Sequence, residues 1–245
     1  MMTRKESNRT ATVDDRSNPE KERLAGRISR RRFLAKSVAA SVGLPLIVSS
    51  SILGRGGHTA PNSRITLGSI GLGIRGTRNM RQFLRHDDVR LVAVCDVFGR
   101  QRKNAKEIVD AFYGNADCAT FNDFRELIAR DDIDAVVVAT PDHWHGPVGV
   151  AAARAGKDMY YEKPVGLSLE QAQALRAAIH EHKTVFQFGT QQRSDRNFRF
   201  ACELARNGRI GALETIHVGA PASFAIPAQP EMPVPEDLDY DMWLG

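Results

Sequence analysis

Residues 65–76 read ITLGSIGLGIRG, an apolar run that leads directly into a glycine-rich turn. The run from Ile65 to Ile70 has the length and the β-branched content of a strand that is buried on both faces. The next six residues match the pattern GxGxxG, and a helix-like segment, 76–85, follows them. A strand, a glycine turn and a helix in this order predict the first unit of a dinucleotide-binding fold.

Each glycine of this turn has its own expected task. Gly71 permits a tight turn, Gly73 lets the backbone approach a pyrophosphate, and Gly76 lets the helix pack close to the strand. The amides and the dipole of the helix N-terminus also favour a phosphate group. We therefore expect the cofactor to be bound by Gly71, Leu72, Gly73, Ile74, Arg75 and Gly76.

A second apolar run, 89–95, ends in Asp96, 20 residues after Gly76. A carboxylate at this point can accept hydrogen bonds from the adenosine ribose and would repel a 2′-phosphate, which favours NAD over NADP. Arg100 is close enough in sequence to leave NADP possible. The alternative is a structural glycine turn followed by a surface aspartate.

The rest of the chain alternates apolar runs with helix-like segments. Further strands are expected at 133–139, 158–161, 185–188 and 213–218, and helices at 100–112, 121–129, 147–155, 169–181 and 195–207. Gly156 and Gly208 stand where helices should end. This alternation predicts an α/β fold, a doubly wound parallel Rossmann sheet over residues 61–188. Residues 220–236 contain five prolines and no helical period.

Two short segments that follow expected strands carry polar side chains. The run 133–139 leads into Thr140, Pro141 and His145, and ligands of doubly wound sheets bind at this edge. His143 and His145 could suggest a metal, but no third ligand stands at a suitable spacing, so we expect none. The run 158–161 leads into Glu162-Lys163-Pro164. A lysine there is costly if it is desolvated, unless the ammonium is used; the alternative is a lysine that reaches the surface.

Five motifs in a fixed order identify a resemblance: GLGIRG at 71–76, VCD at 94–96, ATPDHWH at 139–145, AGKDMYYEKPVG at 155–166 and GTQQR at 189–193. Over about residues 61–219, the chain resembles the Gfo/Idh/MocA family, the group of glucose–fructose oxidoreductase and inositol dehydrogenase. The resemblance implies an NAD(P)-dependent oxidoreductase that acts on a sugar, a polyol or a related carbohydrate.

The resemblance also implies roles for single residues. Lys163 would lie beside the nicotinamide and the reacting carbon, and would help to move the proton of the substrate hydroxyl. Pro164 would follow a cis peptide bond, as it often does in the family. Glu162 would face the ribose or nicotinamide side of the cofactor, His145 would be a catalytic pocket residue, and Arg193 would contact the substrate.

The family further implies a second domain with an open, mostly antiparallel sheet, which completes the catalytic site and makes contacts in a homo-oligomer. Residues 189–245 would be only the start of this α+β domain, so we expect a truncated chain. Two other hypotheses remain open. One is a glycoside-cleaving enzyme of the same fold that retains its NAD, and the other is a non-catalytic dinucleotide-binding remnant.

The basic character of the chain is concentrated in a leader. Residues 1–36 carry 11 Lys or Arg and 5 Asp or Glu, whereas residues 61–245 carry 22 basic and 24 acidic residues. This distribution argues against nucleic-acid binding. Ser29–Lys36 contains paired arginines before a weakly apolar stretch, 37–53, which predicts a twin-arginine signal within residues 1–60. The partner would be the export machinery and the destination the periplasm; a basic amphipathic helix or a short membrane anchor is the alternative.

The chain contains three cysteines, Cys95, Cys118 and Cys202, without CxxC spacing. An odd number with these spacings indicates neither a disulfide framework nor a zinc site. We expect all three to be buried thiols.

Overall fold

The fold is described from a computed structural model, which covers residues 59–219 and 226–245. The twin-arginine segment and nearly all of the leader lie outside the described residues. No helix within the two described ranges is long and apolar enough to cross a bilayer.

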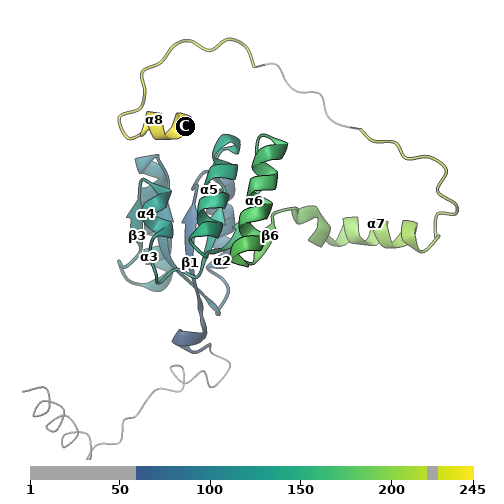
Figure 1. The fold of residues 1–245 in the computed structure, drawn as a ribbon, viewed down its shortest axis with the longest axis horizontal. Coiled ribbons are helices and arrows are strands. Elements are labelled where there is room, and N and C mark those ends of the chain that lie inside the picture. Colours follow the sequence, from purple (N-terminus) through teal and green to yellow (C-terminus); the bar gives the residue numbers. More distant parts are fainter. Residues whose placement is uncertain (1–58, 220–225) are drawn as a thin grey trace, which may run out of the picture. The chain divides into compact units, whose positions relative to one another are not determined.

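Six parallel strands form one sheet, in the order β3-β2-β1-β4-β5-β6. The order reverses between β1 and β4, so the predicted doubly wound sheet is confirmed (Figure 1). The strands are β1 (Ile65–Ile70), β2 (Val89–Cys95), β3 (Ala119–Phe121), β4 (Ala135–Val138), β5 (Asp158–Tyr161) and β6 (Phe186–Phe188).

Helices connect the strands, and several of them begin or end at a residue that caps the helix. Asp123 and Ser168 cap α4 and α6 by accepting hydrogen bonds from backbone N–H groups of the first turn. Gly114 (φ 68°) follows the end of α3, and Gly156 (φ 71°) follows α5 after one further residue, in a left-handed conformation that favours glycine. The helices are α2 (Ile74–Phe83), α3 (Gly99–Tyr113), α4 (Phe124–Ile128), α5 (Asp142–Arg154) and α6 (Leu169–His182).

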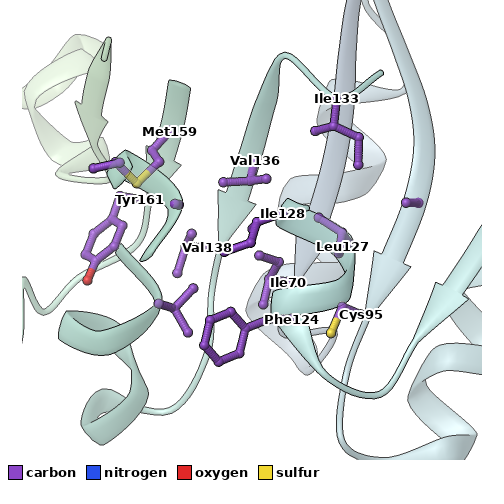
Figure 2. Close-up of a cluster of buried hydrophobic side chains, with 14 of the residues drawn as sticks. Ile70, Cys95, Phe124, Leu127, Ile128, Ile133, Val136, Val138, Met159 and Tyr161 are labelled. Atoms are coloured by element: carbon purple, nitrogen blue, oxygen red, sulfur yellow. The ribbon is translucent and has the colours of Figure 1, made fainter. Parts of the chain in front are cut away.

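Both faces of the sheet are buried. Val136 and Val138 face a core that includes side chains of α4, α5 and α6, whereas Val137, between them, faces a second core with side chains of α2 and α3. Figure 2 shows the first of these cores. All three valines are fully buried, and burial of a side chain of this size contributes about 1.5–3 kcal/mol. Continuous β-branched runs are therefore stable here, as the sequence predicted.

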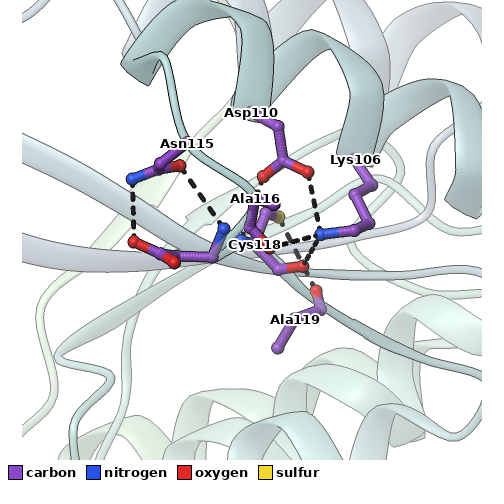
Figure 3. Close-up of polar contacts among 7 residues, drawn as sticks. Lys106, Asp110, Asn115, Ala116, Cys118 and Ala119 are labelled. Carbon is purple, nitrogen blue, oxygen red and sulfur yellow. Dashed lines mark hydrogen bonds and ion pairs between the residues drawn. The ribbon is translucent and has the colours of Figure 1, made fainter.

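Strand β3 was not predicted. Residues 121–129 were expected to be a helix, but α4 begins only at Phe124, after three residues of strand and a capping turn. The connection before β3 is held by Lys106, whose ammonium donates to the carbonyls of Ala116 (2.9 Å) and Cys118 (2.8 Å). The same ammonium lies 2.8 Å from the Asp110 carboxylate, which accepts a bond from the Cys118 amide (Figure 3).

Two other elements differ from the prediction. Residues 213–218 form no strand and are exposed, because no neighbouring strand pairs with them among the described residues. Helix α5 begins at Asp142 rather than at Pro147, so the proline lies inside the helix, where it removes one backbone donor.

Beyond β6 the described residues 189–219 and 226–245 contain no strand of the expected second sheet. They form the 3₁₀ helix η3 (Gln191–Ser194), α7 (Arg196–Arg206) and α8 (Tyr240–Leu244). Helix α7 has no buried residue, so the prediction that Cys202 is buried is wrong, while Cys95 and Cys118 are buried as expected.

Candidate functional site

The glycine turn is tightly packed at two of its three glycines. Gly71 has φ 82°, and a Cβ there would lie 2.5 Å from the backbone of Ala139, at the end of β4. A Cβ on Gly76 would lie 1.8 Å from the carbonyl oxygen of Gly71. Only glycine fits either position, because backbone atoms cannot yield as a flexible side chain can. The glycine turn is thus held against the end of β4, where the strand order reverses.

Gly73 differs from the other two glycines. It caps α2, and no atom lies within 4 Å of the place where a Cβ would be. The amide groups of Ile74, Arg75 and Gly76, in the first turn of α2, have no acceptor within the helix. Open space beside free amides and the positive end of the helix dipole fits a phosphate group. The structure therefore supports a pyrophosphate position at Gly73.

Leu72 and Ile74, which flank Gly73, have opposite environments. The Leu72 side chain is fully buried in the core, and Ile74 is 96% exposed. The Leu72 amide donates a 2.6 Å hydrogen bond to Asp96, so it is not free for a phosphate. Of these two residues, only the backbone of Ile74 is available to a cofactor.

Asp96 is fixed at the end of β2. Its Oδ2 accepts a hydrogen bond from the Leu72 amide (2.6 Å) and its Oδ1 accepts one from the Phe98 amide (2.9 Å). Burial raises the pKa of this carboxyl above its ordinary value, although both hydrogen bonds and Arg102 act in the opposite direction. Each oxygen retains a further lone pair, so the carboxylate can still accept from a ribose hydroxyl.

A pocket joins four of the predicted cofactor residues: Gly71, Asp96, Thr140 and Pro141. Four aromatic or thioether side chains that the sequence did not suggest also line it: Phe124 from α4, Trp144 from α5, and Met242 and Trp243 from α8. Its volume is only about 50 Å³, whereas sites for small molecules commonly have about 300–1,000 Å³. Trp144 could have been suspected from its place in the ATPDHWH motif, but no local pattern links α8 to this pocket.

Glu162 follows β5 and is only 2% exposed. Its Oε1 accepts a 2.9 Å hydrogen bond from the side-chain amide of Asn79 and lies 3.9 Å from the Arg75 guanidinium. Both partners belong to α2, so the helix that begins at the glycine turn also holds the acid of the EKP motif. Asn79 was not predicted as a site residue. Its local sequence shows only that it stands next to Met80, which the structure places in the core.

Lys163 does not lie in the desolvated position that the sequence suggested. It is exposed, and it forms no ion pair among the described residues. The chain turns outward after the buried Glu162, and the described residues supply no wall over the lysine. The Lys163–Pro164 peptide bond is cis, as expected.

His145 is buried, whereas Arg193 is exposed. His145 is 2% exposed; its Nδ1 lies 3.0 Å from the Pro141 carbonyl oxygen, and its ring meets that of Tyr161 edge-on at 5.3 Å. Its Nε2 is buried without a partner in the described residues. Arg193 is exposed on η3, which contacts α2 through a 3.1 Å hydrogen bond from Arg75 to Gln191.

Two groups of residues therefore flank the glycine turn at the carboxyl edge of the sheet. One contains Asp96 and the pocket after β2 and β4, and the other contains Glu162 and Lys163 after β5. A ligand that bridges them would pass over Gly73, between the strands where the order reverses. This arrangement fits a dinucleotide with its adenosine near Asp96 and its reactive end near Lys163.

Comparison with known proteins also indicates an NAD-binding Rossmann fold. Residues 65–190 match the Gfo/Idh/MocA family, described as an oxidoreductase family with an NAD-binding Rossmann fold. Among curated relatives, "Glycosyl hydrolase family 109 protein 1" of Shewanella sp. (strain MR-4) is 32% identical over 162 residues, which are 59% of this chain and 35% of that protein. An alpha-N-acetylgalactosaminidase of Shewanella oneidensis is 36% identical over 119 residues, or 47% of this chain and 26% of that protein. The chain thus spans between about a quarter and a third of the length of these relatives.

Solved structures with the same fold include myo-inositol 2-dehydrogenase from Lactobacillus plantarum. It is 29% identical, with a TM-score of 0.55, over 60% of this chain and 42% of that one. Scyllo-inositol dehydrogenase from Lactobacillus casei, whose crystal structure contains NAD(H) and scyllo-inositol, gives the same identity, TM-score and coverage.

Proposed function

Because the chain belongs to the Gfo/Idh/MocA oxidoreductase family, we propose that it binds NAD and serves hydride transfer between NAD and a sugar, a polyol or a related carbohydrate. The observation that carries the proposal is the position of Gly73. An open approach to the N-terminus of α2 lies between Asp96, the candidate ribose ligand, and the EKP motif. The relatives that are inositol dehydrogenases support a polyhydroxylated substrate.

Each candidate residue of this chain would have a separate role in binding the cofactor or in moving the proton. NAD, when bound, supplies the hydride acceptor. Free amides of the first turn of α2 bind the pyrophosphate, and Asp96 accepts hydrogen bonds from the adenosine ribose. Asn79 and Arg75 fix Glu162, which sets the course of the chain into Lys163. The Lys163 amine accepts the proton of the substrate hydroxyl, provided that substrate and further protein cover it.

Cofactor preference follows from Asp96. A carboxylate next to the adenosine ribose would repel a 2′-phosphate, so NAD is favoured. The guanidinium of Arg100, the candidate for accepting such a phosphate, is already paired with Asp237 at 3.3 Å. This pairing supports NAD over NADP.

A second function is favoured by the names of the curated relatives. A glycoside hydrolase of this fold would oxidise a hydroxyl of its sugar transiently with NAD, eliminate the leaving group, add water across the resulting double bond and reduce the ketone again with NADH, so NAD would be regenerated in each turnover. Glycoside cleavage without net formation of NADH would support it, and the same glycine turn, Asp96 and Lys163 would serve both chemistries.

We also propose that the protein is exported in a folded state by the twin-arginine route, acts in the periplasm, and assembles as a homo-oligomer. The paired arginines of Ser29–Lys36 and the weakly apolar stretch after them support export. Replacement of Arg30, Arg31 and Arg32 by lysine should retain the protein in the cytoplasm, which cell fractionation would detect.

The proposed activity can be tested in two steps. NAD binding is measured by calorimetry, and the NAD-loaded protein is then screened against inositols, aldoses and aryl glycosides. Lys163→Ala should abolish turnover and leave the Kd for NAD within about threefold, because the lysine contacts the reacting end alone. The exposed Lys103→Ala on α3 is the matched control. Near-normal turnover by Lys163→Ala would refute the role of Lys163, and binding without any turnover would favour a non-catalytic dinucleotide-binding protein.

A further inference from the structure

The segment 237–245 pairs with the backbone that directly follows Asp96. Phe98 and Leu238 form an antiparallel bridge, the Gly99 amide donates to the Asp237 carbonyl (2.7 Å), and the Asp239 amide donates to the Val97 carbonyl (3.0 Å). A Cβ on Gly99 would come within 3.3 Å of Asp237, so the approach of the two segments is close. These bonds attach the segment to the loop that carries the candidate ribose ligand.

Side chains attach the same segment to the loop after β3 and to the first turn of α5, both at this edge of the sheet. Asn122, after β3, donates a 2.6 Å hydrogen bond to the Asp239 carboxylate, which also caps α8. In α5, after β4, the Trp144 indole N–H donates to the Met242 carbonyl (2.8 Å). His143 Nε2 lies 2.7 Å from the Trp243 carbonyl oxygen. The last carbonyls of α8 thus find partners in α5, which compensates for the short length of the helix.

Helix α8 forms one wall of the pocket that contains Asp96. Met242 and Trp243 line it from one element, while Gly71, Asp96 and Pro141 line it from the sheet edge. Met242 also packs against the core cluster of α4 and α5, and Trp243 is 40% exposed. The aromatic and thioether side chains of α8 help to enclose this pocket, whose volume is about 50 Å³.

We propose that residues 237–245 are a cover for the adenosine side of the cofactor site, with Met242 and Trp243 as its apolar wall. The inference rests on the proposed binding of NAD and adds a part of the site that lies outside the family-matched residues 65–190. A nucleobase presents two apolar faces, and the pocket offers apolar surfaces from Pro141, Trp144 and Trp243. Flat aromatic surfaces bury such faces favourably.

The hydrogen bonds of the cover suggest how it would act. The side-chain hydrogen bonds involve exposed or half-buried residues, Asn122 after β3 and His143 and Trp144 in the first turn of α5. None of these residues belongs to a strand, so the segment can open without disturbing the sheet. Opening admits the dinucleotide, and closing shields it. A cover of this kind should act mainly on the dissociation rate, because contacts that form after entry are lost only on departure.

The first test compares Trp243→Ala with Phe200→Ala, a truncation of an exposed aromatic side chain on α7 that lies outside the cover and does not line the pocket. Dissociation of NADH is followed by stopped-flow fluorescence after mixing with excess NAD. Trp243→Ala should accelerate dissociation about tenfold with little change in association, and Phe200→Ala should match the wild-type protein. Equal dissociation rates for the two variants would overturn the proposal that residues 237–245 cover the site. Tighter binding of NADH by Trp243→Ala would also overturn it, because α8 would then obstruct the site.

A second measurement needs no variant. Hydrogen exchange of the backbone amides of residues 238–245 should slow when NAD saturates the protein, since bound nucleotide holds the cover closed. Exchange that is unchanged or faster would contradict the proposal. If the unchanged protein binds no NAD or NADH at all, the proposed function itself fails; if it binds and the cover measurements are negative, only the cover is wrong.

Discussion

The side-chain amide of Asn79 donates a 2.9 Å hydrogen bond to the buried carboxylate of Glu162, 83 residues away in the sequence. Asn79 belongs to the helix that starts at the glycine turn, and Glu162 precedes Lys163. The bond therefore couples the expected phosphate end of the cofactor site to the expected reactive end. It also supplies a direct hydrogen-bond donor to a charged group that is only 2% exposed.

Replacement of Asn79 by alanine should destabilise the protein. Without the amide, the Glu162 carboxylate loses a buried donor, which costs about 1–3 kcal/mol in the free energy of unfolding. The control is Asn104→Ala, an exposed helical asparagine whose replacement should change that free energy by no more than about 0.5 kcal/mol. Urea unfolding of both variants measures the difference, and similar values for the two would show that the bond contributes nothing.

The glycines of the turn should separate folding from binding. Gly76→Ala places a Cβ 1.8 Å from the Gly71 carbonyl oxygen, so the backbone must move, at a cost of about 3 kcal/mol or more. Gly73→Ala meets no atom within 4 Å and should keep stability within about 1 kcal/mol. Its methyl group would occupy the approach to the pyrophosphate and should weaken NAD binding at least about tenfold.

Thermal unfolding and calorimetric titration with NAD test this pair. Retained NAD affinity in a stably folded Gly73→Ala variant would move the pyrophosphate away from Gly73. A stable Gly76→Ala variant would show that α2 can shift away from β1.

Asp96 should make stability depend on pH in an identifiable way. Burial raises the pKa of Asp96 in the folded protein above the ordinary value of 3.8, so the folded state holds this proton more tightly than the unfolded state. The contribution of Asp96 is therefore fully present below pH 3.8 and is lost as the pH rises through the folded-state pKa. The Asp96→Asn variant does not titrate at this position. Relative to this variant, the wild-type protein should lose stability as the pH rises from 3.8 through the folded-state pKa of Asp96.

Urea unfolding at a series of pH values measures that difference, with the exposed Asp87→Asn as the control. A difference between Asp96→Asn and the unchanged protein that stays constant with pH would contradict the proposed burial of the carboxylate. The same Asp96→Asn protein should bind NAD more weakly and discriminate less against NADP.

The three cysteines should differ in reactivity. Only the thiolate is nucleophilic, and burial raises the pKa of Cys118 to about 11 and the pKa of Cys95 also upward. Cys202 is exposed on α7. Brief alkylation of the folded protein should therefore label Cys202 alone, and alkylation in denaturant should label all three, as peptide mass spectrometry would show. Labelling of Cys95 in the folded protein would contradict the packing of β2.

Local patterns predicted the central part of the fold well. The ends of β1, β2 and β5 agree with the sequence to the residue, because continuous apolar runs bounded by polar or glycine residues mark strands that are buried on both faces. Strand β3, with three residues, is too short for any period to be recognised. Residues 213–218, which read LETIHV, were expected to be a strand and form none, since a strand also requires a partner that local sequence does not specify.

The candidate site was predicted in part for the same reason. Gly71, Gly76 and Asp96 occupy positions that short-range geometry dictates, a turn after a strand and the end of the neighbouring strand. Exposure of Lys163 and burial of His145 were not accessible from the sequence, because both depend on which surfaces fold back over a strand end.

The sequence by itself determined a doubly wound sheet with a glycine turn, a following acid and an EKP motif, because strand and helix periods and glycine conformations are local properties. Only the tertiary structure decided that Asn79 binds Glu162 and that Met242 and Trp243 form a wall opposite Asp96. These contacts join residues about 80 to 150 positions apart, and they exist only after the sheet has brought the carboxyl ends of its strands to one edge.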